Sequence, residues 1–187
     1  MSAGVADRPR IAVLDYGIGN LHSAHKALER MGADATLTAD PAVIAAADGV
    51  VLPGVGNFGA CMQAMRDAEL VAPALDAVAS GRPFLGVCVG MQMLFDFSEE
   101  VGPDVTGLGV IPGVIRWIPP GVKRPQMQWN RLVIDRPDDP MLRGLTADGS
   151  EPWMYFVHSL HGVPADPEVV VARCEYGGML NAAFRWQ

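Results

Sequence analysis

Short apolar runs alternate with helical patterns along the first half of the chain. The run from Arg10 to Asp15 is almost continuously apolar, which is typical of a strand buried on both faces. It is followed by an expected helix, capped by Asn20 and ended by Gly32. Apolar residues recur at helical spacing on one face of this helix, at Leu21, Ala24, Leu28 and Met31. The same pattern predicts strands at 35–38, 49–52 and 83–87, and helices starting at 41 and covering 58–66 and 70–79.

The second half of the chain changes character after Phe97. Its apolar segments are strand-like with little helix between them, at Gly113–Trp117, Arg131–Ile134, Met154–His158 and Val169–Arg173. Strands that alternate with helices imply a parallel sheet, whereas consecutive strands imply antiparallel pairing. We therefore predict an α/β fold: a mostly parallel central sheet flanked by helices, with antiparallel strands added by the C-terminal half, in one domain over residues 1–187.

Composition narrows the function classes. The chain has 187 residues, of which 50% are hydrophobic, and a formal net charge of −7, which argues against a nucleic-acid partner. No apolar run reaches membrane-spanning length, and the N-terminal ten residues contain no hydrophobic signal core, so we expect no membrane association and a cytoplasmic location. The three cysteines are far apart, without the spacing of a disulfide framework or a metal site.

The sharpest chemical motif is Gly86-Val87-Cys88-Val89-Gly90, between a predicted strand and the helical pattern at 91–95. It has the form of a nucleophile elbow with sulfur in place of the serine oxygen. We expect the helix N-terminus to favour the Cys88 thiolate, and the Val89 amide to point towards an oxyanion. The alternative is a buried cysteine that packs as a small hydrophobe. That packing role is the one we expect for Cys61 and Cys174.

A second glycine-rich segment, 53–59, follows the third predicted strand. Gly54, Gly56 and Gly59 formally match a dinucleotide-binding fingerprint, which would make the protein an oxidoreductase. The motif follows the third strand rather than the first, however, and no strand carrying an acidic residue follows at the usual distance. The other interpretations are a loop whose amides complete an oxyanion hole beside Cys88, or a plain structural turn.

A cysteine nucleophile normally works with a histidine base. His22 and His25 fall on the first helix, where a surface role is expected. His158 and His161 flank a strand end and are candidates for the base, although sequence spacing gives no geometric test of either.

At these motifs the sequence resembles the triad, or class I, glutamine amidotransferases, and among them the glutaminase subunits of imidazole glycerol phosphate synthase. The likeness extends over nearly the whole chain. It is carried by Asp15–Leu21, Pro53–Gly56, Gly86–Gln92, Trp129-Asn130, Tyr155–Ser159, and the stretch from Tyr176-Gly177 to Ala182-Ala183.

The resemblance implies that Cys88 attacks the side-chain amide of L-glutamine and forms a thioester, releasing ammonia, with no cofactor and no metal. It places the oxyanion on the amides of Val55 and Val89. Further residues are implied to hold the substrate, namely Gly54, Gly56, Gln92, Ser159 and Leu160. It also implies a heterodimer with a (β/α)₈-barrel cyclase subunit that receives the ammonia for histidine biosynthesis, with Asn20, Trp129 and Asn130 facing this partner.

Several residues depart from the family pattern. The family's triad histidine and glutamate stand in a Gln-Phe-His-Pro-Glu motif, and this motif is not among the 187 residues. Leu160 replaces a usual tyrosine, and Gln126 and Gln128 replace a histidine and a glycine. Two hypotheses follow: a glutaminase whose triad is completed in the full protein, or a non-catalytic glutaminase-like subunit that docks on the cyclase without hydrolysing glutamine.

Overall fold

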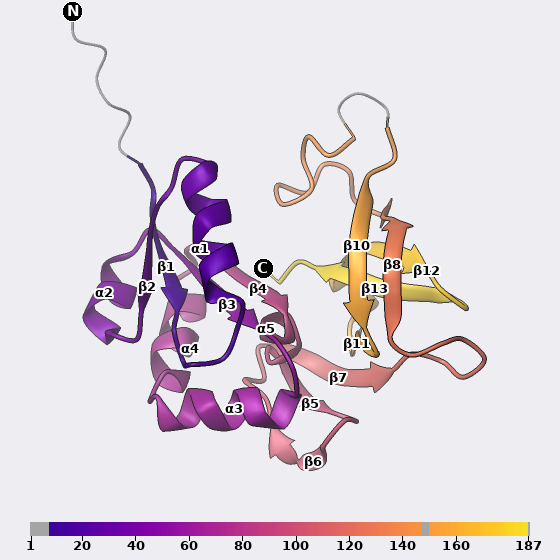
Figure 1. Cartoon of the computed structure of the whole chain (residues 1–187), viewed down its shortest axis with the longest axis horizontal. Helices are drawn as coiled ribbons and strands as arrows, with labels where there is room; N and C mark the ends of the chain where they lie inside the picture. The colour runs from indigo at the N-terminus through magenta and orange to yellow at the C-terminus, as the bar shows by residue number, and fades with distance from the viewer. Residues whose placement is uncertain (1–7, 147–149, 187) are drawn as a thin grey trace, which may run out of the picture. The chain divides into compact units, whose positions relative to one another are not determined.

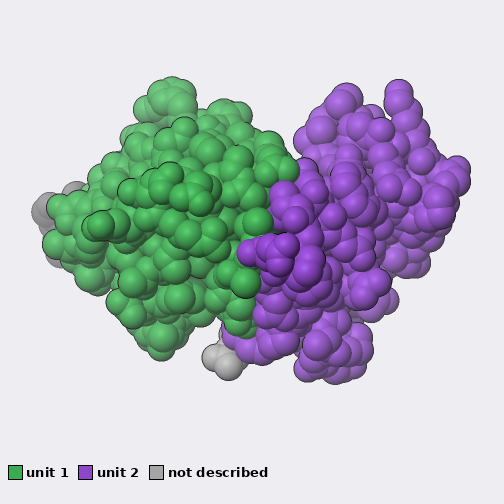
Figure 2. Space-filling view, turned by 90° about the horizontal axis from the view of Figure 1, so that it is seen from below, with its two compact units in different colours: residues 1–94, 105–110 green, residues 95–104, 111–187 purple. Residues whose placement is uncertain are grey.

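The structure is a computed structural model that describes residues 8–146 and 150–186. Residues 1–7, to which the expectation of a missing signal core mainly applies, lie outside the described part. The chain divides into two compact units, coloured separately in Figure 2: unit 1 comprises Met1–Leu94 and Val105–Val110, and unit 2 comprises Phe95–Asp104 and Ile111–Gln187. That the whole chain acts as one domain stays a prediction.

Unit 1 is built on the predicted parallel sheet, with strand order β2-β1-β3-β4 (Figure 1). Its strands are β1 (Arg10–Leu14), β2 (Asp34–Thr38), β3 (Gly49–Gly54) and β4 (Phe84–Cys88). All three pairings in this sheet are parallel. Strand β3 is buried along its whole length, as its continuous apolar sequence predicts for an inner strand.

The helices of unit 1 also follow the sequence pattern, with two local differences. They are α1 (Leu21–Arg30), α2 (Pro41–Ala46), α3 (Phe58–Asp67), α4 (Val71–Ala79) and α5 (Val89–Gln92). Asn20 occupies the N-cap position of α1, but at φ −81° and ψ 60° its backbone is not extended and its side chain makes no capping hydrogen bond. Met31, expected on the buried face, lies beyond the end of the helix and is 85% exposed.

The helix predicted at 91–95 is mostly absent. Helix α5 ends at Gln92, and the carbonyls of Met93 and Leu94 accept hydrogen bonds from the amides of Leu108 and Val110. These contacts with a distant segment replace the hydrogen bonds that would continue the helix. Phe95 instead begins a strand.

Unit 2 holds most of the remaining strands, in three small sheets of order β10-β8, β11-β7-β5-β6 and β13-β12-β9. Pairing is antiparallel in β8–β10, β7–β11, β9–β12 and β12–β13, as expected, and parallel between β5 and β7. The bounds are β5 (Phe95–Ser98), β6 (Gly102–Thr106), β7 (Ile111–Trp117), β8 (Gln126–Arg131), β9 (Val133–Ile134), β10 (Trp153–His158), β11 (Leu160–Pro164), a 3₁₀ turn (Pro167–Val169), β12 (Val170–Glu175) and β13 (Met179–Phe184).

The segment 131–134, predicted as one strand, is divided between two sheets. Strand β8 ends at Arg131, whereas Val133 and Ile134 pair with β12. Between them the Leu132 amide donates to the carbonyl of Pro152. The buried Leu132 side chain packs in a core cluster with Val171.

Each unit has its own apolar interior. In unit 1 the large fully buried side chains come from the sheet, from α2, from α3 and from the segments after α3 and α5: Leu14, Ile44, Leu52, Phe58, Met62, Met65, Leu70 and Met93. In unit 2 they include Phe95, Ile115, Ile118 and Leu180. Within the described ranges, no helix has the length and apolarity that a membrane crossing demands.

Candidate active site

Cys88 stands at the junction of β4 and α5 in a strained backbone conformation. Its φ is 56° and its ψ is −119°, and the residue is exposed. Among the described residues, only Glu69 shares a positive φ without being glycine. Such a conformation costs about 1–3 kcal/mol, and it is typical of nucleophile elbows, where it holds the reactive side chain away from the sheet. The predicted elbow geometry is therefore present.

The two glycines that flank Cys88 are required by close backbone packing. A Cβ on Gly90 would stand 1.9 Å from the carbonyl oxygen of Leu52, and one on Gly86 would stand 2.7 Å from the Cα of Met91. Neither neighbour is a flexible side chain that can move away. The spacing Gly-x-Cys-x-Gly is thus a consequence of how tightly α5 turns back onto β3 and β4.

The glycine-rich loop after β3 lies directly beside this elbow. Parallel pairing of β3 with β4 sets Gly54 opposite Cys88. A Cβ on Gly54 would stand 2.5 Å from the Gly90 amide nitrogen. Val55 and Gly56 then leave the sheet exposed to solvent, Gly56 with a φ of 85°. The structure brings the loop and the cysteine together as predicted, while the oxyanion role of Val55 and Val89 stays a prediction.

Two residues that the sequence analysis did not assign to the site lie under this loop. The buried Tyr16 hydroxyl donates to the Pro53 carbonyl at 2.6 Å, and the buried Cys61 thiol donates to the Val55 carbonyl at 3.3 Å. Cys61 is fully buried on α3 and was expected only to pack. Sequence spacing does not point to the Tyr16 contact, because it joins residues 37 positions apart that meet only in the folded sheet. The Cys61 contact spans six residues and depends on how α3 leaves the loop.

The protonation state of Cys88 differs from the expectation of a favoured thiolate. Partial burial raises the pKa of the Cys88 thiol above its ordinary value, and the hydrogen bond from the Val89 amide offsets only part of this effect. Helix α5 has only four residues, so the dipole invoked for the thiolate is weak. A raised pKa disfavours the thiolate of Cys88, so a base is needed to activate the thiol.

The other predicted site residues of unit 1 divide by exposure. Gln92 is buried on α5, one turn from Cys88, whereas Asn20 is exposed at the start of α1. The partner and substrate roles implied for them stay predictions.

Two predicted substrate residues belong to unit 2. Ser159 lies between β10 and β11, and Leu160 is the first residue of β11. The Ser159 carbonyl accepts from the Ile118 amide, and the Leu160 side chain is buried. The predicted partner residue Trp129 is 64% exposed, whereas the Asn130 side chain donates to the Glu175 carbonyl at 2.7 Å. Their contacts with glutamine or a cyclase stay predictions.

Of the two histidines considered as bases, His158 is already engaged within unit 2, whereas the buried Nδ1 atom of His161 has no hydrogen-bond partner among the described residues. Both ring nitrogens of His158 have partners, the Leu160 carbonyl at 2.8 Å and the Gln126 side-chain oxygen at 2.9 Å. Burial lowers the pKa of both His158 and His161. Gln126, which replaces a family histidine, is fully buried and supports His158. The contacts of His158 indicate a structural role.

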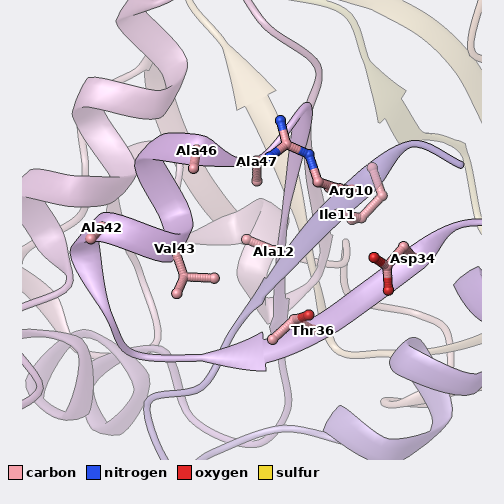
Figure 3. A pocket seen from close by; sticks show the side chains of 9 residues that line it. All are labelled: Arg10, Ile11, Ala12, Asp34, Thr36, Ala42, Val43, Ala46 and Ala47. Carbon is pink, nitrogen blue, oxygen red and sulfur yellow. The ribbon is translucent and has the colours of Figure 1, made fainter. Parts of the chain in front are cut away.

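One cavity of unit 1 lies away from Cys88. It measures about 340 Å³ and is lined chiefly by small apolar side chains, with Arg10, Asp34 and Thr36 as its polar members (Figure 3). Arg10 and Asp34 begin β1 and β2, so the cavity lies near the amino ends of the parallel strands, whereas Gly54 and Cys88 are at their carboxyl ends. Among the described residues, no three His, Cys, Asp or Glu side chains gather as a metal site requires.

Comparisons with known proteins agree with this geometry. Residues 12–185 match the family model of glutamine amidotransferase class-I. The chain is 47% identical, over 175 residues, to the imidazole glycerol phosphate synthase subunit HisH of Synechococcus elongatus, which covers 92% of this chain and 78% of the relative. It is also 47% identical to the subunit HisH of Syntrophotalea carbinolica. That match covers 92% of this chain and 85% of the relative.

Solved structures of low sequence identity share the fold. A crystal structure of a glutamine amidotransferase has a TM-score of 0.65 at 19% identity, covering 91% of this chain and 82% of that one. PurLQS from Thermotoga maritima has a TM-score of 0.67 at 21% identity, covering 94% and 78%. The dinucleotide-binding alternative for the segment 53–59 is not favoured by any of these likenesses.

Proposed function

Since this chain belongs to the class-I glutamine amidotransferase family, and within it to the HisH subunits of imidazole glycerol phosphate synthase, we propose that it is the glutaminase subunit of such a synthase. It releases ammonia from L-glutamine through a thioester on Cys88. The observation that carries the proposal is the strained Cys88 backbone beside the Gly54 loop. The proposal includes a cytoplasmic location.

The proposed chemistry assigns a part to each group at the elbow. The Cys88 sulfur, once deprotonated, attacks the amide carbon of glutamine, and the carbonyl oxygen becomes an oxyanion. The amides of Val89 and Val55 would stabilise this charge, a contribution worth about 10²–10³ in rate for one donor. Collapse of the intermediate expels ammonia after it takes up a proton, and water then hydrolyses the thioester to glutamate.

The partner in this proposal is a cyclase that takes up the ammonia. One face of the β8–β10 ribbon supports it, because alternate residues on both strands are exposed and apolar. Trp129 is opposite Tyr155 with the rings 5.7 Å apart, and Met127 is opposite Val157. Exposed contiguous aromatic groups are typical of protein interfaces. We propose that this ribbon face contacts the cyclase.

The test compares glutamine-dependent and ammonia-dependent synthesis with the cyclase present. Cys88→Ala is expected to abolish glutamate release and glutamine-dependent synthesis while ammonia-dependent synthesis continues. The assay is run on residues 1–187 and on the chain as its gene encodes it, because the family's triad histidine and glutamate are not among the 187 residues. Cyclase binding without any glutamine hydrolysis in the gene-encoded chain would contradict the proposal and favour a docking subunit.

A further inference from the structure

The loop beside Cys88 is held from beneath by two buried side chains. Tyr16, from the segment after β1, donates its hydroxyl to the Pro53 carbonyl, and Cys61, from α3, donates its thiol to the Val55 carbonyl. Tyr16 is 5% exposed and Cys61 is fully buried, so both donor groups are shielded from water.

These two bonds fix the Pro53–Gly54 and Val55–Gly56 peptide groups, which lie on either side of the peptide group that joins Gly54 to Val55. In a trans peptide the carbonyl and the following amide point in opposite directions. Holding the Pro53 carbonyl therefore sets the direction of the Gly54 amide, and holding the Val55 carbonyl sets that of the Gly56 amide. Gly56 has no side chain to restrict its backbone, so hydrogen bonds from neighbouring groups supply part of the restraint.

We propose that Cys61, together with Tyr16, is a positioning residue that sets the direction of the backbone amides in the loop beside Cys88. The inference rests on the proposed function, because it concerns the loop expected to complete the oxyanion hole. It assigns a role in this site to a cysteine that does not react.

The two side chains also interact with each other. Burial, together with the neighbouring Cys61 and Cys88, raises the pKa of the Tyr16 hydroxyl. Tyr16 thus keeps its proton over the working pH range and remains a donor to Pro53. The Met93 sulfur lies 3.9 Å from the same hydroxyl. The loop, the opening segment and α3 are therefore linked through one small buried network within unit 1.

The test measures how fast Cys88 reacts with two probes. A diazo-ketone analogue of glutamine places its carbonyl oxygen at the oxyanion position while the Cys88 sulfur bonds to the methylene carbon, with loss of dinitrogen and uptake of a proton. Iodoacetamide reports only exposure and ionisation of the thiol. The ratio of the two rate constants therefore isolates the contribution of the loop. Variants are Cys61→Ala, which loses the donor, and Cys61→Ser, which keeps one in similar volume.

We expect Cys61→Ala to lower the ratio about tenfold, less than removal of a whole oxyanion donor, and Cys61→Ser to restore most of it. Tyr16→Phe is expected to lower it similarly. Cys174→Ala and Tyr176→Phe are matched controls in unit 2, where Cys174 is equally buried and the Tyr176 hydroxyl donates to the Lys123 carbonyl. A ratio unchanged in both Cys61→Ala and Tyr16→Phe would overturn the inference.

A second measurement decides the inference independently of reactivity. Backbone amide exchange at residues 54–56 is expected to accelerate in Cys61→Ala and to return towards the original rate in Cys61→Ser, with unit 2 amides unchanged. Equal exchange in all three proteins would contradict the positioning role. If the unaltered protein does not react selectively at Cys88, the proposed function fails, and amide exchange still decides whether Cys61 positions the loop.

Discussion

Gly54 and Cys88 stand opposite each other at the carboxyl ends of two neighbouring parallel strands. The pairing leaves no room for a side chain on Gly54, since a Cβ there would meet the Gly90 amide nitrogen and the backbone of Val89. Glycine at this position is therefore required by the elbow that it faces, and the loop and the cysteine form one unit of structure.

The strain at Cys88 predicts a gain in stability when the cysteine is removed. Cys88→Gly is expected to raise the free energy of unfolding by about 1 kcal/mol, because glycine adopts positive φ without cost, although its greater freedom in the unfolded chain offsets part of the gain. Urea denaturation measures the difference. Cys174→Gly is the control: this buried residue of β12 has no positive φ, and its loss is expected to destabilise. A less stable Cys88→Gly protein would contradict the strained elbow.

Substitution by alanine is expected to destabilise the protein much more at an elbow glycine than at a glycine with looser surroundings. Gly90→Ala places a methyl group against the Leu52 backbone and is expected to cost more than about 3 kcal/mol or to prevent folding. Gly49→Ala has as its nearest neighbour the Ile11 Cδ1 atom at 3.1 Å, the end of a flexible side chain. Its expected cost is about 1 kcal/mol or less. Thermal unfolding of both variants checks the order, and equal losses would contradict the packing described for the elbow.

The raised pKa of Cys88 predicts how its reactivity depends on pH. Only the thiolate is alkylated, so the rate with iodoacetamide is expected to increase through the alkaline range, with a midpoint above that of an exposed cysteine in a short peptide. The rate is measured from pH 6 to pH 11 by mass spectrometry of the Cys88 peptide. A midpoint below that of the peptide control would show that the elbow stabilises the thiolate.

The ribbon face predicts a partner contact that stability measurements do not detect. Trp129→Ala is expected to weaken binding to the cyclase by more than tenfold, as aromatic residues at interface centres do, while changing the unfolding free energy by less than about 1 kcal/mol. Met31→Ala is a control, because Met31 is even more exposed and lies outside the ribbon. Titration calorimetry measures the affinity of both variants for the cyclase. Unchanged affinity in Trp129→Ala would contradict the contact.

Local pattern was sufficient to predict the parallel sheet and the elbow. Continuous apolar runs identify β1, β3 and β4, and the glycines around Cys88 identify a tight turn, because both signals arise from neighbours in sequence. The residues of α2 were also predictable, since Pro41 begins the helix and the Asp40 side chain accepts from the Ala42 amide.

Features that depend on distant segments could not be predicted in this way. Helix α5 ends early because residues near 108 take the carbonyls of Met93 and Leu94. The Tyr16 contact joins the segment after β1 to Pro53 in β3, 37 residues further along the chain. The raised pKa of Cys88 likewise follows from atoms packed around the sulfur, which the motif alone does not reveal.

Site-resolved labelling of the native protein with the diazo-ketone analogue, in the presence of the cyclase, tests directly whether Cys88 is the nucleophile. Peptide mass spectrometry compares modification at Cys88, Cys61 and Cys174 with and without excess glutamine. We expect modification at Cys88 alone and protection by glutamine. Equal modification of the three cysteines, or labelling of Cys88 that glutamine does not slow, would contradict this role of Cys88.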